Sequence, residues 1–147
     1  MADKSLAELK QGVTEAYGNY LSQLKESGPV WEQKPATAGE GEEAWSARQV
    51  AEHIASANLY FANGIARMIG AEGPAMQQPQ LASVDEAVTA TESAQAGFMG
   101  VVEKLNDEHM AIEVEHPRFG KQTPGAVISL VTHHLGDHAN QLKTLRG

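Results

Sequence analysis

The chain has 147 residues, a length that fits one domain with a hydrophobic core of its own. It carries 11 Lys and Arg against 19 Asp and Glu, and this formal net charge of -8 argues against nucleic acid and anionic membranes as partners. It contains no cysteine, which excludes disulfides, thiolate metal ligands and a thiol nucleophile of the protein's own.

The N-terminal segment is charged and amphipathic and lacks the apolar centre of a secretion signal. No uninterrupted apolar run approaches membrane-spanning length. We therefore expect a single domain, residues 1–147, that resides in the cytoplasm and has no membrane partner.

The predicted elements begin with an amphipathic helix from Ser5 to about Lys25. Its apolar residues recur at three- and four-residue steps, and they are Leu6, Leu9, Val13, Tyr17, Tyr20 and Leu24. Glycine and proline end this helix, and the stretch Val30–Ala44, rich in Pro, Gly and Glu, predicts a long solvated loop. Within that loop, Trp31 is expected to pack on the helices.

A second helix is predicted to begin at Ser46, which can form a capping box with Gln49. Trp45, just before the cap, can form a hydrophobic staple with the first turn. The helix is expected to end before the glycines and proline of residues 70–74, and its apolar line puts His53 on the buried side. That line comprises Val50, His53, Ile54, Ala57, Tyr60, Phe61, Gly64, Ile65 and Met68.

A third helix is predicted from Ser83, with a capping box to Glu86, as far as Asn106. Its apolar line comprises Val84, Ala87, Val88, Thr91, Ala94, Phe98, Val101, Val102 and Leu105. The stretch Ala111–Glu115 then alternates apolar and polar residues, as a strand does. We therefore expect a short hairpin or ordered loop before the last helix.

A fourth helix is predicted to open with Thr123 as N-cap and Pro124 at its first position, and to run to Arg146. His134 and His138 are four residues apart, so both imidazoles project from one face. The predicted buried line comprises Val127, Val131, His134, His138, Gln141 and Leu145. Burying its two imidazoles and its amide without partners would cost about 1–3 kcal/mol each, so something inside the fold must satisfy them.

Four helices of this length predict an all-α four-helix bundle. Such bundles build metal sites from side chains on facing helices. A di-iron site would need Glu-x-x-His motifs on paired helices, and the one such motif, Glu113–His116, falls in the strand-like connection. The sequence therefore argues against a di-iron protein.

Three histidines, His53, His134 and His138, fall on the core-facing lines of two predicted helices. Three neutral imidazoles with an open coordination position are a known catalytic zinc arrangement, and nickel or iron accepts the same ligands. The alternative is that these histidines are structural and hydrogen-bond to neighbours such as Tyr60 or Asn58. Spacing alone leaves both interpretations open.

Residues near the three histidines are candidates for orienting them. Gln141 lies one turn beyond His138 on the same face and can hydrogen-bond near a metal. His133 points about 100° away from its neighbour around the helix, so it is expected to flank the site. Asp137 could hold an imidazole from another helix, although a solvated position is the simpler expectation.

Two motifs resemble the DinB/YfiT-like metalloenzymes. The segment Trp45–Ile54 is similar to their Trp-Ser-x-x-x-(apolar)-x-x-His-(apolar) motif, and His134–Leu142 resembles their His-x-x-x-His-x-Gly-Gln-(apolar) helix. The segment Thr123–Gly125 is also similar. Asn140 departs from the glycine usual in the family, whereas Gln141 is retained. The resemblance covers the chain from Trp45 to its end, and the first helix by topology.

The resemblance implies an up-down-down-up bundle that holds one divalent ion, zinc or nickel, through His53, His134 and His138. It also implies that homodimers are common. Some members of the family resemble thiol-dependent S-transferases or a mycothiol-dependent maleylpyruvate isomerase, and others are called hydrolases. The resemblance therefore points to a scaffold and a metal more directly than to a substrate.

We expect a metal-dependent enzyme that activates water or a low-molecular-weight thiol for attack on a small molecule, as a hydrolase or a thiol S-transferase. Without cysteine, any thiol must be a cosubstrate such as bacillithiol, mycothiol or glutathione. Arg118 and Lys121 could meet an anionic substrate or could simply be solvated. The rival hypothesis is a non-catalytic bundle that binds a small ligand or a partner, with structural histidines.

Overall fold

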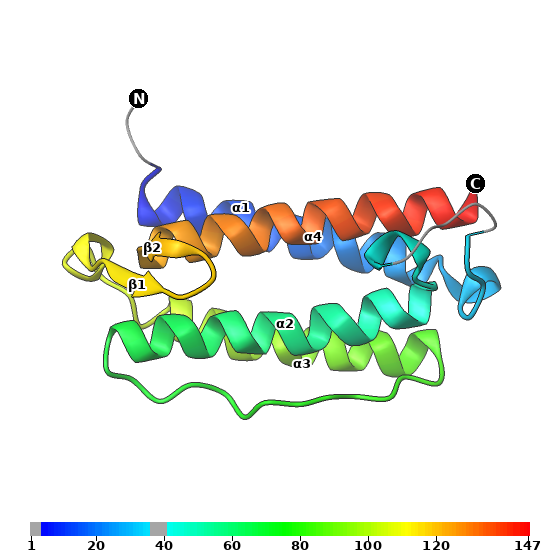
Figure 1. Ribbon diagram of the computed structural model, residues 1–147, viewed down its shortest axis with the longest axis horizontal. Helices are drawn as coiled ribbons and strands as arrows, with labels where there is room; N and C mark the ends of the chain where they lie inside the picture. The colour runs from blue at the N-terminus through cyan, green and yellow to red at the C-terminus, as the bar shows by residue number, and fades with distance from the viewer. Residues whose placement is uncertain (1–3, 36–40) are drawn as a thin grey trace.

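The computed structural model describes residues 4–35 and 41–147, which form four long helices, a short hairpin and three turns of 3-10 helix (Figure 1). No helix within these residues is both long and apolar enough to cross a membrane. In chain order the elements are α1 (Leu6–Lys25), η1 (Gly28–Val30), η2 (Glu42–Ala44), α2 (Ala47–Met68), α3 (Val84–Val102), η3 (His109–Ala111), β1 (Val114–His116), β2 (Gly120–Gln122) and α4 (Pro124–Arg146).

Side-chain caps begin all four long helices at or next to the predicted residues. At α2 the predicted capping box is complete, because Ser46 accepts from the Gln49 backbone at 3.3 Å and Gln49 accepts from the Ser46 backbone at 3.0 Å. At α3 the box is incomplete, because the Glu86 carboxylate accepts from the backbone of Ala82 instead. Each cap stabilises its helix by about 1 kcal/mol and sets where the helix starts.

The helices form an up-down-down-up four-helix bundle, as predicted. Helices α1 and α4 lie side by side and run one way, whereas α2 and α3 lie side by side and run the other (Figure 1). The connection 69–83 must therefore return along the length of the bundle. Leu81 fastens it, since its N–H donates to Glu52 at 2.8 Å and its carbonyl accepts from the Trp31 indole at 3.2 Å.

The buried face of α2 differs from the predicted line. The prediction followed large apolar side chains, whereas α2 turns a face rich in small residues into the core, which lets the neighbouring helices approach. Tyr60, expected in the core, is 42% exposed, and His53 is half-buried. The buried residues of α2 are Ala47, Val50, Ala51, Ile54, Ala55, Asn58, Leu59, Ala62, Ile65 and Ala66.

Helix α4 is rotated in the same sense relative to its predicted line. His138 is buried, but His134 and Gln141 are half-buried at the margin of the core. The line that packs inside comprises Pro124, Val127, Ile128, Val131, Leu135, His138, Ala139 and Leu142. The polar groups of α2 and α4 therefore lie where the bundle core meets solvent, which lowers the cost of burying them.

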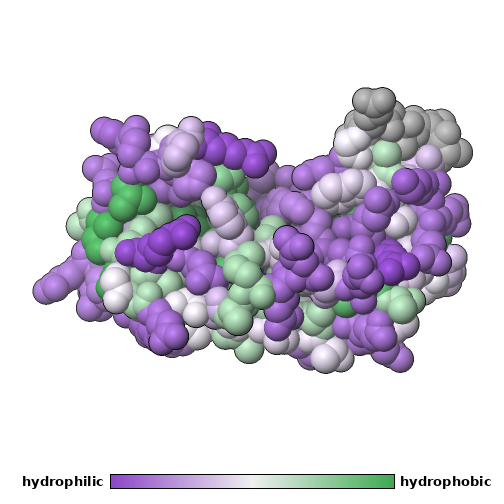
Figure 2. Space-filling view, turned by 60° about the horizontal axis from the view of Figure 1, so that its bottom comes forward, coloured by the Kyte–Doolittle hydropathy of each residue, from purple (hydrophilic) through white to green (hydrophobic). Residues whose placement is uncertain are grey.

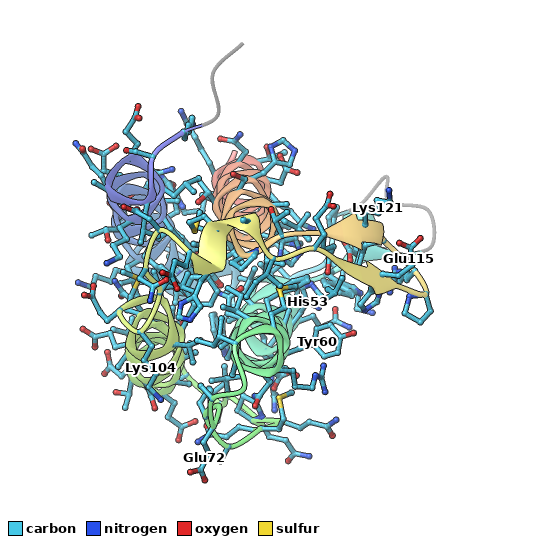
Figure 3. All side chains as sticks on the ribbon, turned by 90° about the vertical axis from the view of Figure 1, so that its left-hand side faces the viewer. His53, Tyr60, Glu72, Lys104, Glu115 and Lys121 are labelled. Atoms are coloured by element: carbon cyan, nitrogen blue, oxygen red, sulfur yellow. The ribbon has the colours of Figure 1, made fainter. Side chains whose placement is uncertain are left out.

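The predicted hairpin is present, although its first strand starts later than expected. Ala111 belongs to η3, and β1 pairs antiparallel with β2 in the register Val114 to Gln122 and His116 to Gly120. Figure 3, which views the bundle along its axis, shows the hairpin projecting on the side where α2 and α4 meet. The hairpin thus covers one edge of the bundle.

Candidate metal centre

Three imidazoles meet where α2 and α4 face each other. His53 comes from α2 and lies between the two helices (Figure 3), and His134 and His138 come from successive turns of α4. The Nε2 atom of His134 lies 3.1 Å from Nε2 of His53 and 3.1 Å from Nε2 of His138. The structure therefore brings together the three histidines selected from the sequence, with their ring nitrogens within 4.8 Å of one another.

Gln141 determines which nitrogen of His138 carries the proton. The Gln141 amide nitrogen donates to the backbone carbonyl of Glu42 at 2.6 Å. Its amide oxygen, which can only accept, therefore lies 2.7 Å from Nδ1 of His138. The proton of the neutral His138 ring is then on Nδ1, and the lone pair of Nε2 points at the other two imidazoles.

Hydrogen bonding alone does not account for the spacing of the three nitrogens. Since Nε2 of His138 has no proton, the neutral forms of His53 and His134 can supply at most one well-formed hydrogen bond for the two 3.1 Å contacts. Nitrogens that share one tetrahedral zinc ion at about 2.0–2.1 Å lie about 3.3–3.4 Å apart, close to the 3.1 Å of these two contacts. The donor set and its spacing therefore fit a divalent cation.

Burial favours the uncharged forms of His53 and His134. Desolvation, with the nearby His138 and His53, lowers the pKa of His134 from 6.5 to about 4. Desolvation, again with His138, also lowers the pKa of His53. The Nδ1 atom of His134 is buried and has no hydrogen-bond partner among the described residues, so no acceptor there stabilises a charged ring. Neutral rings are the form that binds metal.

The lowered pKa values predict a loss of stability in acid for protein stripped of metal. Between pH 6.5 and about 4, the unfolded chain protonates His134 while the folded chain does not, so the free energy of unfolding falls as the pH falls through this range. Chemical unfolding in EDTA at several pH values measures this loss. The slope should be smaller in His134→Gln; an equal slope in that variant would contradict the assignment.

Two further residues of the centre were missed in the sequence. The Glu42 carboxylate lies 4.0 Å from Nε2 of His53 and 3.8 Å from Nε2 of His138. Trp45, predicted as a staple and as the first residue of the family-like motif but not as part of the site, stacks on His138 with an interplanar angle of 11° and a centroid distance of 6.3 Å. The stretch before α2 is therefore not simply a solvated loop, because η2 folds back onto the histidines. The predicted loop residues 36–40 lie outside the described residues.

The other candidates lie apart from the three rings. His133 and Asp137 pair with each other at 3.3 Å, and their side chains are 78% and 63% exposed, so neither contacts the cluster. Asn58 is buried and donates to the Tyr17 hydroxyl at 2.7 Å. Tyr60 hydrogen-bonds His116 at 3.0 Å. Neither partner suggested for structural histidines is thus bonded to them in this structure.

The sequence profile of the DinB superfamily matches residues 12–142. The chain belongs to the DinB superfamily. Two solved structures share its fold: TT2238, described as a four-helix bundle protein, is 23% identical with a TM-score of 0.69, covering 97% of this chain and 98% of its own. YfiT from Bacillus subtilis, described as a probable metal-dependent hydrolase with an unusual four-helix bundle topology, is 15% identical with a TM-score of 0.73, covering 99% and 89%. No curated protein matches the sequence.

A cavity of about 590 Å³ opens beside the histidines of this DinB chain. Aromatic rings and a few polar groups line it, as is usual for small-molecule sites. Figure 2 shows apolar side chains gathered on one face toward the end where the hairpin lies in Figure 1. The principal lining residues are His53, His134, Tyr60, Phe61, Arg118 and Phe119.

Proposed function

We propose that this DinB chain is a divalent-metal-dependent enzyme acting on a small molecule. The observation that carries the proposal is that the Nε2 atoms of His53, His134 and His138 lie close together. The hydrogen bond from Nδ1 of His138 to Gln141 leaves the Nε2 of His138 with a lone pair for an ion. Three imidazole ligands with open positions suit zinc, and nickel accepts the same set.

An ion held by His53, His134 and His138 would lower the pKa of a water or a thiol beside it toward neutrality and so supply a nucleophile. Within the chain, Gln141 orients His138, and Trp45 stacks on the same ring. Glu42 lines the cavity and lies within 4.0 Å of two ligand nitrogens, where its carboxylate can accept the proton of the nucleophile. The cavity then holds the molecule to be attacked.

The nucleophile is either water or a low-molecular-weight thiol, because the chain has no cysteine. YfiT is described as a probable metal-dependent hydrolase, which supports a hydrolase. The resemblance to thiol-dependent members of the family supports an S-transferase. Cleavage of esters or amides without added thiol would favour the hydrolase, and reaction with electrophiles only in the presence of thiol would favour the transferase. The cytoplasmic location, the homodimer and the absence of a nucleic-acid partner stay predictions.

Elemental analysis of protein purified without added metal tests the proposal. We expect about one divalent ion per chain in the wild type and far less in His134→Ala and His138→Ala, because two imidazoles bind such ions weakly. His133→Ala is the matched control, since its exposed ring lies on the same helix, and it should keep the metal. Unchanged metal content in His134→Ala and His138→Ala would contradict the ligand assignment. A wild type without metal that unfolds on replacement of His53 would support the non-catalytic bundle instead.

A further inference from the structure

The turn of the hairpin is fastened over the cavity by His116. Its Nδ1 atom accepts from the backbone N–H groups of Arg118 at 3.0 Å and Phe119 at 3.2 Å. A nitrogen that accepts carries no proton, so Nε2 carries it and donates to the hydroxyl of Tyr60 on α2 at 3.0 Å. Figure 3 shows Tyr60 on the hairpin side of α2. Arg118 and Phe119 are thereby tied to the helix that carries His53.

Arg118 brings a positive charge to the cavity. Its guanidinium lies 5.4 Å from the centroid of the Phe119 ring, and it forms no ion pair with a carboxylate of the residues that the structure describes. It is the basic residue among the described lining residues. A guanidinium presents a planar pair of donors that matches a carboxylate in a bidentate manner.

An apolar wall joins the Arg118 end of the cavity to the histidine end. The ring of Phe61 lies 6.2 Å from that of Phe119 and 6.4 Å from that of His134, measured between centroids. Aromatic walls at this spacing favour a flat apolar body, which they contact at little cost in conformational entropy. The volume of about 590 Å³ is that of a site for one small molecule.

We propose that the cavity binds a small carboxylic acid with a flat apolar body. Arg118 binds the carboxylate, Phe61 and Phe119 contact the body, and the opposite end of the molecule lies at His53 and His134. The assignment of that opposite end as the reacting end rests on the proposed function. The carboxylate can belong to the substrate or to a thiol cosubstrate, and Arg118 recognises the same group in both.

The test compares 3-phenylpropionate with its uncharged amide, 3-phenylpropanamide, by calorimetric or NMR titration of the full-length protein. We expect the acid to bind about tenfold more tightly than the amide, and the two to bind about equally in Arg118→Gln. Amide binding should not change in Arg118→Gln, which shows that the cavity is intact. Lys121→Gln removes a charge from the same hairpin but not from the cavity lining, and it should keep the tenfold preference.

The same titration on metal-free His134→Ala separates this proposal from the proposed function. The preference for the acid should persist there, because Arg118 and not the ion provides it. The proposal is overturned if the preference for the acid is lost in metal-free His134→Ala but kept in Arg118→Gln. It is also overturned if the wild type binds the acid and the amide equally, or binds neither at millimolar concentration. Once a turnover assay exists, the KM values of Arg118→Gln identify which molecule carries the carboxylate. The KM should rise for that molecule alone, either the substrate or the thiol.

Discussion

Replacing Gln141 by leucine is expected to weaken divalent metal binding by about 10–100-fold, although all three histidines remain. The Gln141 amide oxygen accepts from Nδ1 of His138 at 2.7 Å, and its amide nitrogen donates to the Glu42 carbonyl at 2.6 Å. Leucine has a similar volume but neither hydrogen bond. His138 would then lose the acceptor that holds its proton on Nδ1 and its lone pair toward the ion.

Competition with a fluorescent chelator of known zinc affinity measures this loss. Asn140→Leu is the matched control, because it makes the same kind of change at an exposed neighbour on α4 and should leave the affinity unchanged. If Gln141→Leu binds zinc as tightly as the wild type, Gln141 serves packing and not the metal centre. That result would leave the ligand role of His138 to be decided by the metal content of His138→Ala.

Replacing Phe98 by alanine is expected to lower the free energy of unfolding by about 3–5 kcal/mol. The Phe98 side chain is 0% exposed, and its ring lies 6.4 Å from that of Tyr17, where α3 packs against α1. Alanine would leave a cavity that two long helices cannot close without shifting. Urea unfolding in EDTA measures the change without a contribution from bound metal.

The control for this substitution is Phe119→Ala, because the Phe119 ring is 40% exposed on the hairpin. We expect it to cost about 1 kcal/mol or less, since little apolar surface returns to water. A loss of about 1 kcal/mol or less in Phe98→Ala as well would mean that the contact between α1 and α3 is not part of the stabilising core. The pair therefore distinguishes residues that hold the bundle together from residues that shape the cavity.

The candidate metal centre lies at the margin of the core, and this position suits the proposed chemistry. His138 is buried, whereas the side chain of His53 is 29% exposed and the Glu42 side chain 57% exposed. Desolvation thus favours the neutral forms of His53 and His134, while one side of the cluster stays open to the cavity. A centre at the middle of the bundle would be closed to a substrate.

Local interactions let the sequence determine the helices and most of their limits. Caps such as Ser46 and Thr123 bond backbone groups three residues away, so the residues that make them are readable without knowledge of the fold. The spacing of His134 and His138 is likewise a property of one helix. His53 entered the candidate site because a strong helix start before it indicated which way it faces.

The tertiary structure decided what the sequence could not. Whether His53 and Tyr60 lie inside the core depends on how far α2 is rotated against α3, and small residues on α2 set that rotation. The approach of Glu42 to the histidines depends on a turn whose partner, Gln141, lies 99 residues further along the chain. No periodic pattern records a contact of that range, because it arises only when two helix ends and a loop are packed together.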